Sequence, residues 1–394
     1  MKLGVGVPLA AGLILGAVGC SSRASEAAQV VQGGSAGALA VAGAAGSPKA
    51  PSTSPAAGGS SREGPDTDLP FDGLAGNGAG GDAGIGAPSD AGAARFVVRG
   101  VCWNPVGVGA THPEGLDYAG FSDIDIPLMV ELGVNVVRTY EPLLDRSVLD
   151  RLWAAGIRVI ESIYPYGGVE AAVVTERVRA VKDHPAVLYW ALGNEWNYNG
   201  LYVGLTLDQS RERLNEAAAL VRAEDPTRPI ATIYGELPSA EVLAAMPDID
   251  LWGINAYRGL SFGDLFDAWR ALSDKPMFIA EYGADAYNAN LPGYDPESQA
   301  LATDALTREI LEQATGASAG AHVLGGTVFE WADEWWKDAA GSPSEQEVGG
   351  IAPGGGPYPD QVFNEEWWGL VDVERTPRPA FERLRRVFAE FGER

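Results

Sequence analysis

After residue 95 the chain alternates between short β-branched runs and longer amphipathic runs, eight of each. This alternation is typical of repeated βαβ units, which build a parallel sheet. Eight units predict an α/β fold, a (β/α)8 TIM barrel over residues 95–394, and about 300 residues suit one such domain. The expected strands are 96–103, 134–140, 157–164, 187–194, 229–236, 250–257, 276–283 and 325–331.

A glutamate closes the fourth expected strand, and another closes the seventh. Glu195 directly follows the fourth expected strand in VLYWALGNE, and Glu281 lies at the end of the seventh, in PMFIAEYG. The C-terminal ends of barrel strands converge on one mouth, where active sites are built. Strands four and seven lie across the barrel from each other, so the two carboxylates can reach the ~5–5.5 Å separation used by retaining glycosidases. The pair therefore predicts cleavage of a glycosidic bond.

The N-terminal quarter of the chain predicts a secreted and tethered protein. Lys2 and an apolar stretch precede Gly19-Cys20, which is the pattern of a signal peptide over 1–19. The run ending at Cys20 resembles a bacterial lipobox, in which the cysteine is acylated; the alternative is an ordinary signal peptide with a chance cysteine. An acylated Cys20 would anchor the protein to a membrane on the extracytoplasmic side. Ser21 and Ser22 then favour the outer membrane.

Residues 20–94 form the second predicted segment, a disordered tether between the lipid and the barrel. Ala, Gly, Ser and Pro dominate it, and aromatic residues are nearly absent. A segment of this composition buries too little apolar surface to offset the entropy of ordering. We expect it to be a flexible spacer that lets the barrel reach substrate away from the lipid surface.

Charge and side-chain chemistry exclude several classes of partner. The formal net charge of −25 argues against nucleic acid, and it disfavours polyanionic substrates such as uronic acid polymers. Only Cys102 remains once Cys20 is lipidated, so no disulfide framework is expected. The three histidines, His112, His184 and His322, are scattered without metal-ligand spacing, so no metal site is expected, and cleavage by a pair of carboxyl groups requires no cofactor. We expect a monomer whose partners are an oligo- or polysaccharide and the membrane.

Two motifs resemble those of clan A glycoside hydrolases. DHPAVLYWALGNEW resembles the acid/base signature of the family that contains β-galactosidases and β-glucuronidases, and FIAEYG resembles the nucleophile strand, notably in β-1,3-glucanosyltransferases. The resemblance covers about residues 96–390. It implies a retaining mechanism with Glu195 as general acid/base and Glu281 as nucleophile.

The same resemblance implies roles for residues that bind substrate or support the nucleophile. Asn194 matches the residue that hydrogen-bonds the sugar 2-hydroxyl, Arg138 matches one that keeps the nucleophile ionised, and Tyr257 matches a donor to the nucleophile. Trp331 matches an aromatic floor beneath the reacting sugar. Aromatic residues also gather near strand ends, where they would stack on sugar rings or pack the loops: Trp103, Tyr140, Tyr164, Tyr166, Trp196, Tyr198, Trp335 and Trp336.

Other carboxylates at strand ends compete for these roles, and they are Glu161, Glu236, Glu330, Asp333 and Glu334. Glu161 and Glu330 could bind sugar hydroxyls or support the catalytic pair. A long Gly/Pro-rich connection over 337–375 should lie at the mouth, where its aromatic residues would contact sugar or pack on the barrel.

The layout of the chain departs from the β-galactosidase-like family, which carries β-sandwich domains where this chain has a tether. A single barrel is closer to the cellulase/mannanase and glucanosyltransferase families, so the substrate does not transfer with the motifs. We expect a retaining β-glycoside hydrolase or transglycosidase acting on a neutral β-linked glucan or mannan. The alternatives are a carbohydrate-binding envelope lipoprotein without catalytic activity and a purely structural one.

Overall fold

A computed structural model describes residues 96–291, 293–315, 322–337, 341–348, 350–351 and 357–392. The predicted signal peptide over 1–19, the acylated Cys20 and the tether over 20–94 lie outside the described residues. Among the residues that the structure describes, no helix is both long and apolar enough to cross a membrane.

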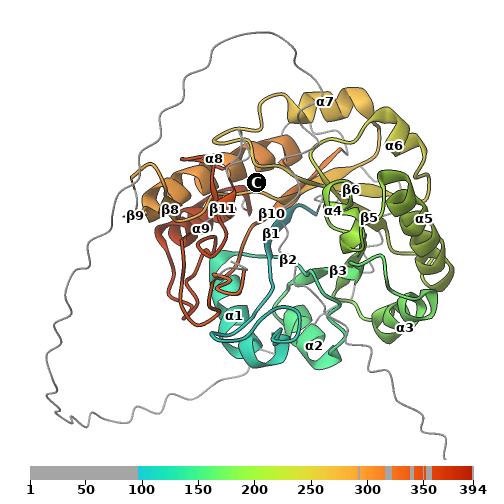
Figure 1. The fold of residues 1–394 in the computed structure, drawn as a ribbon, viewed down its shortest axis with the longest axis horizontal. Helices are drawn as coiled ribbons and strands as arrows, with labels where there is room; N and C mark the ends of the chain where they lie inside the picture. The colour runs from blue at the N-terminus through green and yellow to red at the C-terminus, as the bar shows by residue number, and fades with distance from the viewer. Residues whose placement is uncertain are drawn as a thin grey trace, which may run out of the picture. The chain divides into compact units, whose positions relative to one another are not determined.

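Eight parallel strands close into a barrel in the order β1-β10-β7-β6-β5-β4-β3-β2, and helices surround it (Figure 1). The predicted (β/α)8 TIM barrel is confirmed. The barrel strands are β1 (Val98–Cys102), β2 (Val136–Arg138), β3 (Arg158–Tyr164), β4 (Val187–Leu192), β5 (Ile230–Gly235), β6 (Leu251–Asn255), β7 (Met277–Glu281) and β10 (Val323–Val328).

The helices between the strands form the outer layer (Figure 1). They are α1 (Tyr118–Leu132), α2 (Arg146–Ala154), α3 (Ala171–Val181), α4 (Trp196–Asn199), the 3-10 turn η2 (Gly200–Tyr202), α5 (Leu207–Glu224), α6 (Ala240–Ala244), α7 (Leu265–Leu272), α8 (Pro296–Thr315) and α9 (Pro379–Gly392). Two short hairpins complete the fold: β8 (Tyr287–Asn288) with β9 (Gly293–Tyr294), and β11 (Gly350–Ile351) with β12 (Phe363–Asn364).

Local sequence signals set the ends of these elements. Helix α5 begins at a capping box in which the Thr206 hydroxyl accepts from the Gln209 amide, and the Gln209 side chain accepts from the Thr206 amide. Helix α1 ends at Gly133, whose φ of 89° lies in the left-handed region that a glycine adopts readily. Such signals set the residue at which a helix begins or ends.

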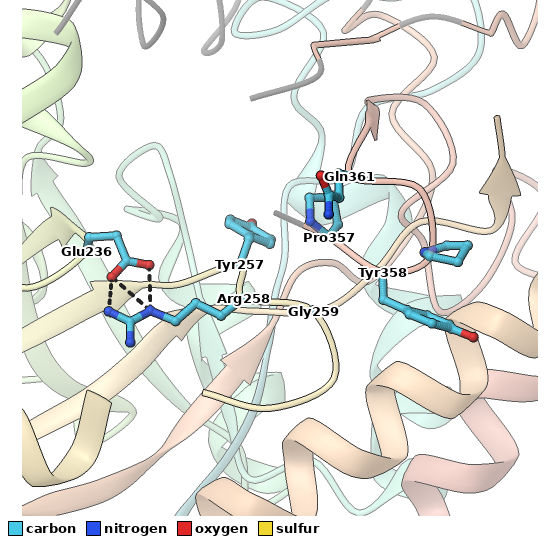
Figure 2. A pocket seen from close by; sticks show the side chains of 8 residues that line it. Glu236, Tyr257, Arg258, Gly259, Pro357, Tyr358 and Gln361 are labelled. Carbon is cyan, nitrogen blue, oxygen red and sulfur yellow. Dashed lines mark hydrogen bonds and ion pairs between the residues drawn. The ribbon is translucent and has the colours of Figure 1, made fainter. Parts of the chain in front are cut away.

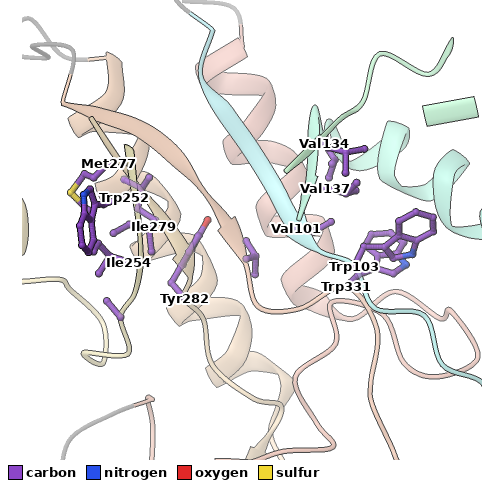
Figure 3. Packing of buried hydrophobic residues seen from close by; sticks show 14 of the residues in the cluster. Val101, Trp103, Val134, Val137, Trp252, Ile254, Met277, Ile279, Tyr282 and Trp331 are labelled. Carbon is purple, nitrogen blue, oxygen red and sulfur yellow. The ribbon is translucent and has the colours of Figure 1, made fainter. Parts of the chain in front are cut away.

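Side chains alternate between two apolar layers along the strands. The inner layer fills the barrel and includes Val98, Val136, Ile160, Tyr189 and Phe278. The outer layer lies between strands and helices, and Figure 3 shows part of it: Val101, Trp103, Val134, Val137, Trp252, Ile254, Met277, Ile279, Tyr282 and Trp331. This two-residue period decides which side chains near the strand ends can reach the mouth.

Candidate active site at the barrel mouth

The last residue of β7, Glu281, is held by three donors from two other strand ends. Arg138 Nη1 and the Tyr140 hydroxyl each donate to Glu281 Oε1 at 2.8 Å, and the Tyr257 hydroxyl donates to Oε2 at 2.9 Å. Glu281 is 6% exposed. A buried cation and two hydroxyl donors stabilise the negative charge of this carboxylate and fix its orientation. These are the properties that a nucleophile needs.

Arg138 connects this carboxylate to the amide next to Glu195. It ends β2 and is 0% exposed, and its Nη2 donates to Asn194 Oδ1 at 2.7 Å. Asn255 Nδ2 donates to the same oxygen at 3.2 Å. With its carbonyl bound twice, Asn194 has a fixed orientation, and its Nδ2 lies 3.4 Å from the Tyr202 hydroxyl. The predicted residues Arg138, Asn194, Tyr257 and Glu281 therefore form one network.

Glu195 lies beyond the end of β4 in a different environment. Its φ of 47° is in the left-handed region, and its side chain is half-buried. Burial, followed by the negative charge of Glu281, raises the pKa of Glu195 to about 8, against opposing effects of Asn255 and Arg138. A carboxyl group with this pKa is protonated at neutral pH and can donate a proton.

Two of the predicted sugar-stacking residues face away from the mouth. Trp331 is 1% exposed and packs at 6.3 Å between ring centroids against Phe381 of α9, because β10 ends at Val328 and the chain has turned outward by residue 331. Figure 3 shows its ring beside Trp103 in the outer layer. Its assignment as the aromatic floor is wrong.

Trp196 is the second correction. It is 0% exposed, and its indole Nε1 donates to Thr232 Oγ1 at 2.9 Å behind the barrel wall. Its ring also packs edge-on against Tyr234 at 5.0 Å. The residue follows Glu195 directly, and the backbone there enters α4, which turns the indole toward the outer core. Trp196 is therefore a packing residue.

Two further aromatic residues pack on the tyrosines around Glu281: Phe329, which the sequence interpretation did not single out, and Trp368 of the 337–375 connection. Phe329 packs edge-on against Tyr140 at 6.4 Å and against Tyr257 at 6.3 Å. Trp368 packs against Tyr257 at 5.3 Å and against Phe329 at 5.3 Å. These contacts hold the two tyrosines that donate to Glu281. Trp368 comes from the 337–375 connection, so part of that connection packs on the barrel.

A cationic side chain near the mouth is surrounded by carboxylates. Lys337 Nζ lies 2.7 Å from Glu334, 3.8 Å from Glu330 and 3.8 Å from Glu365, and 4.1 Å from the centre of the Phe329 ring. Burial, followed by the charge of Glu334, raises the pKa of Glu330 well above its usual range. The predicted substrate contact Trp335 is half-buried nearby, and its role stays a prediction.

The remaining competing acids have structural partners. The buried Glu161 accepts from the Leu143 amide at 2.7 Å, and Asp333 forms a buried ion pair with Arg378. Glu236 is paired with Arg258. Within the described part of the chain, no group of three or more His, Cys, Asp or Glu side chains is arranged to hold a metal ion.

Comparisons with known proteins point to the same class of barrel. Residues 167–313 match the family described as glycosyl hydrolases family 2, TIM barrel domain. The chain is 27% identical to rat β-glucuronidase over 223 residues, which cover 49% of this chain and 33% of that protein. It is 26% identical to cat β-glucuronidase over 310 residues, which cover 68% of this chain and 44% of that protein. The chain thus spans a third to less than half the length of these relatives.

Solved structures share the fold at lower identity. A galacturonate-bound family 2 β-galacturonidase from Eisenbergiella tayi superposes with a TM-score of 0.52 at 18% identity, covering 75% of this chain and 51% of that one. Bacteroides uniformis β-glucuronidase 2, covalently bound to a cyclophellitol aziridine, gives 0.55 at 19% identity, covering 74% and 35%. The barrel thus resembles those of clan A glycoside hydrolases, the likeness that the motifs around Glu195 and Glu281 predicted.

Proposed function

We propose that this protein is a retaining β-glycoside hydrolase or transglycosidase acting on a neutral β-linked glucan or mannan. The observation that carries this proposal is the pairing of two unlike carboxyl groups at one mouth. Glu281 is fixed by three donors, and Glu195 has a pKa of about 8, which burial raises first and the charge of Glu281 second. Two carboxyl groups in such environments are the requirement for double displacement.

In the first step of this mechanism Glu281 attacks the anomeric carbon and Glu195 gives its proton to the departing oxygen. A covalent glycosyl-enzyme forms, and the leaving group departs as an alcohol. Protonation keeps the leaving group from departing as an alkoxide, which is why the raised pKa of Glu195 matters. Arg138, Tyr140 and Tyr257 orient the attacking carboxylate.

In the second step Glu195, now ionised, takes a proton from water or from a sugar hydroxyl as that oxygen attacks the anomeric carbon. The bond to Glu281 breaks, and both carboxyl groups return to their starting states. Asn194 is placed to hydrogen-bond the sugar, since Arg138 and Asn255 occupy its carbonyl and leave its amide nitrogen as the donor. Hydrolysis and transfer differ only in which acceptor arrives first.

A neutral substrate is favoured because the cationic side chains described around the mouth are already paired with carboxylates. A uronide carries a carboxylate that needs a cationic partner, and the relatives described above are named for glucuronides and galacturonides. In the described part of this mouth, Arg138 pairs with Glu281, Arg258 pairs with Glu236 and Asp264, and Lys337 contacts three carboxylates. A further carboxylate would meet more negative than positive charge there.

A panel of aryl β-glycosides with one leaving group tests the substrate class. We expect kcat/KM for the glucoside or mannoside to exceed that for the glucuronide by roughly 100-fold, because an unpaired buried charge is strongly rejected. Glu365→Gln removes one of the negative charges around Lys337, so it should raise the rate on the glucuronide relative to the rate on the neutral glycosides. A glucuronide preference in the unaltered protein would contradict the neutral substrate and leave the mechanism standing.

Anchoring through Cys20 to the outer membrane, on the extracytoplasmic side, is also a proposal. It is supported by the apolar stretch before Gly19-Cys20 and by the Ala/Gly/Ser/Pro-rich segment that follows. Cys20→Ser should move the protein from the membrane fraction to the soluble extract and remove the lipid mass from its N-terminal peptide. An unchanged membrane fraction would contradict the proposed anchoring.

We also expect a monomer, and light scattering of the detergent-solubilised protein checks this expectation.

A further inference from the structure

A cavity of about 470 Å3 opens beside the catalytic pair, and neither carboxylate lines it. Its walls include Glu236, Tyr257, Arg258, Pro357 and Gln361. Figure 2 shows the paired Glu236 and Arg258 on one side, the segment 357–361 on the other and Tyr257 between them. Tyr257 also donates to Glu281 Oε2 at 2.9 Å. The cavity therefore shares one wall with the nucleophile's surroundings, and its size falls in the ~300–1,000 Å3 range of small-ligand pockets.

The polar wall of this cavity is built from two strand ends. Arg258 Nε donates to both carboxylate oxygens of Glu236 at 3.1 Å, and its Nη2 donates to Oε2. Arg258 Nη1 donates to the Phe262 carbonyl at 3.1 Å and to Asp264 at 3.3 Å, which anchors the guanidinium. A bidentate pair of this kind holds both groups in one plane. The pair keeps solvent-facing edges, since the side chains of Glu236 and Arg258 are 39% and 30% exposed.

The backbone at Glu236 repeats an unusual feature of Glu195. Glu236 follows β5 with a φ of 61°, and Glu195 follows β4 with a φ of 47°. A left-handed conformation costs a non-glycine residue ~1–2 kcal/mol, and it persists where surrounding contacts require it. The Glu236 amide donates to the Asn255 carbonyl at 3.0 Å, and Asn255 Nδ2 also binds Asn194. Through Asn255, the Glu236–Arg258 pair is thus hydrogen-bonded to the same network that orients the catalytic groups.

An exposed aromatic ring, three residues after Glu195, packs on the last residue of β5, next to Glu236. Tyr198 is 43% exposed and packs directly over Gly235, where an added Cβ would come within 2.1 Å of its ring. Asn197 fixes that contact by bonding both the carbonyl and the amide of Gly235, at 3.0 and 2.9 Å. Burial, and then the charges of Glu195 and Glu236, raises the pKa of Tyr198 to about 12. The ring is accessible, fixed and close to both carboxylates.

We propose that Tyr198, the Glu236–Arg258 pair and the segment 357–361 form the subsite for the neutral sugar ring on the leaving-group side of the scissile bond. The inference rests on the proposed function and names where its leaving or acceptor sugar binds. Glu195 protonates the departing oxygen, so the sugar attached to that oxygen must lie on the Glu195 side of the nucleophile. A sugar in this subsite would stack a C–H face on the Tyr198 ring, and its hydroxyl groups would hydrogen-bond to the Glu236–Arg258 pair.

Comparing two leaving groups of very different size tests this subsite in the full-length protein. The leaving group of β-D-glucosyl fluoride is a single fluoride ion, which makes no contact with the proposed subsite. The β-1,3- and β-1,4-linked glucose tetrasaccharides have a leaving group that fills the subsite. The corresponding mannose compounds are used if the protein acts on mannosides. We expect Tyr198→Ala to lower kcat/KM for the tetrasaccharide about tenfold more than for the fluoride, which corresponds to ~1.4 kcal/mol. Gly235→Ala should act in the same direction by displacing the ring.

Trp153→Ala is the matched control, because Trp153 is a similarly exposed aromatic residue, 42% exposed, on α2 in the outer layer. It should change both substrates equally. Glu236→Gln should also weaken the tetrasaccharide selectively, since it keeps an acceptor but removes the charge that holds Arg258. Equal losses on both substrates in Tyr198→Ala and Glu236→Gln would overturn the subsite while leaving the glycosidase intact.

Binding to the Glu281→Gln protein separates the subsite from the chemistry. Calorimetry with the tetrasaccharide should show weaker binding when Tyr198→Ala is added, and unchanged binding when Trp153→Ala is added. If the unaltered protein cleaves neither substrate, the proposed function fails, and this binding comparison still decides the subsite. Identical affinity with and without Tyr198→Ala would overturn it.

Discussion

The two carboxyl groups at the mouth differ in almost every property that sets their reactivity. Glu281 ends a strand, is nearly inaccessible and accepts hydrogen bonds from one guanidinium and two phenols. Glu195 follows a strand in a left-handed conformation, is half-buried and has a pKa of about 8, owing first to burial and then to the charge of Glu281. In the proposed mechanism this difference suits Glu281 to attack as a carboxylate and Glu195 to donate a proton.

The largest effect should come from removing the attacking carboxylate. Glu281→Ala should lower kcat by about 10^4-fold or more, because no glycosyl-enzyme can form. Azide should restore turnover and release the α-glycosyl azide, since the anion attacks once from the side that the carboxylate occupied. Product analysis by NMR checks this, and a β-azide from Glu281→Ala would exchange the roles of the two groups.

Removing the proton donor should have an effect that depends on the leaving group. Glu195→Ala should cost ~10²–10⁴-fold on an alkyl or sugar leaving group, the usual contribution of general acid catalysis. A dinitrophenyl leaving group needs no proton, so its glycosylation step should be nearly unaffected. Pre-steady-state rates with both substrates make the comparison. The same loss on both would show that Glu195 does not protonate the leaving group.

Arg138, which holds Glu281, should contribute less to the catalytic rate than Glu281 does and more to the stability of the fold. Arg138→Gln removes a buried cation that contacts both Glu281 and Asn194. We expect a ~10²–10³-fold loss of kcat, as for other preorganised donors, and a loss of about 3–5 kcal/mol in the free energy of unfolding. Activity and denaturant unfolding are measured on the same protein. Unchanged stability would show that the pair is not buried as described.

The smallest predicted effect is a shift in pH dependence. Glu195 is the active acid only while protonated, so kcat/KM should fall as pH rises through about 8. The charge of Glu365 contributes to the raised pKa of Glu195, as do burial and Glu281, whereas Arg138 and Asn255 oppose it. Glu365→Gln should therefore move the alkaline limb to lower pH. A shift to higher pH would contradict this electrostatic account.

The alternation of strands and helices predicted the barrel and the convergence of Glu195 and Glu281, and the resemblance to clan A motifs added Arg138, Asn194 and Tyr257. Parallel strands in a closed barrel end on the same side, so residues at the ends of expected strands, such as Arg138, Tyr257 and Glu281, must converge. Tyr140 was noted only as an aromatic residue near a strand end. Its spacing of two from Arg138 could have placed it on the same face, beside the nucleophile.

Contacts beyond the strand ends were not predictable in the same way. Trp331 lies three residues past the end of β10 and Trp196 four residues past the end of β4, where the two-residue period no longer applies, and both side chains lie in the outer core. Trp368 reaches Phe329 and Tyr257 from a connection with no regular period. Such placements depend on long-range packing, which local sequence patterns do not encode.

Covalent trapping tests the central claim most directly. An activated 2-fluoro glycoside slows breakdown of the glycosyl-enzyme, so intact mass and peptide mapping reveal the attacking residue. We predict one sugar adduct on Glu281, from a neutral sugar, with Glu281→Gln as the unlabelled control. An adduct on Glu330 or another carboxylate would contradict the assignment. If no sugar labels the protein while oligosaccharides still bind, the barrel is a carbohydrate-binding protein and the mechanism proposed here is wrong.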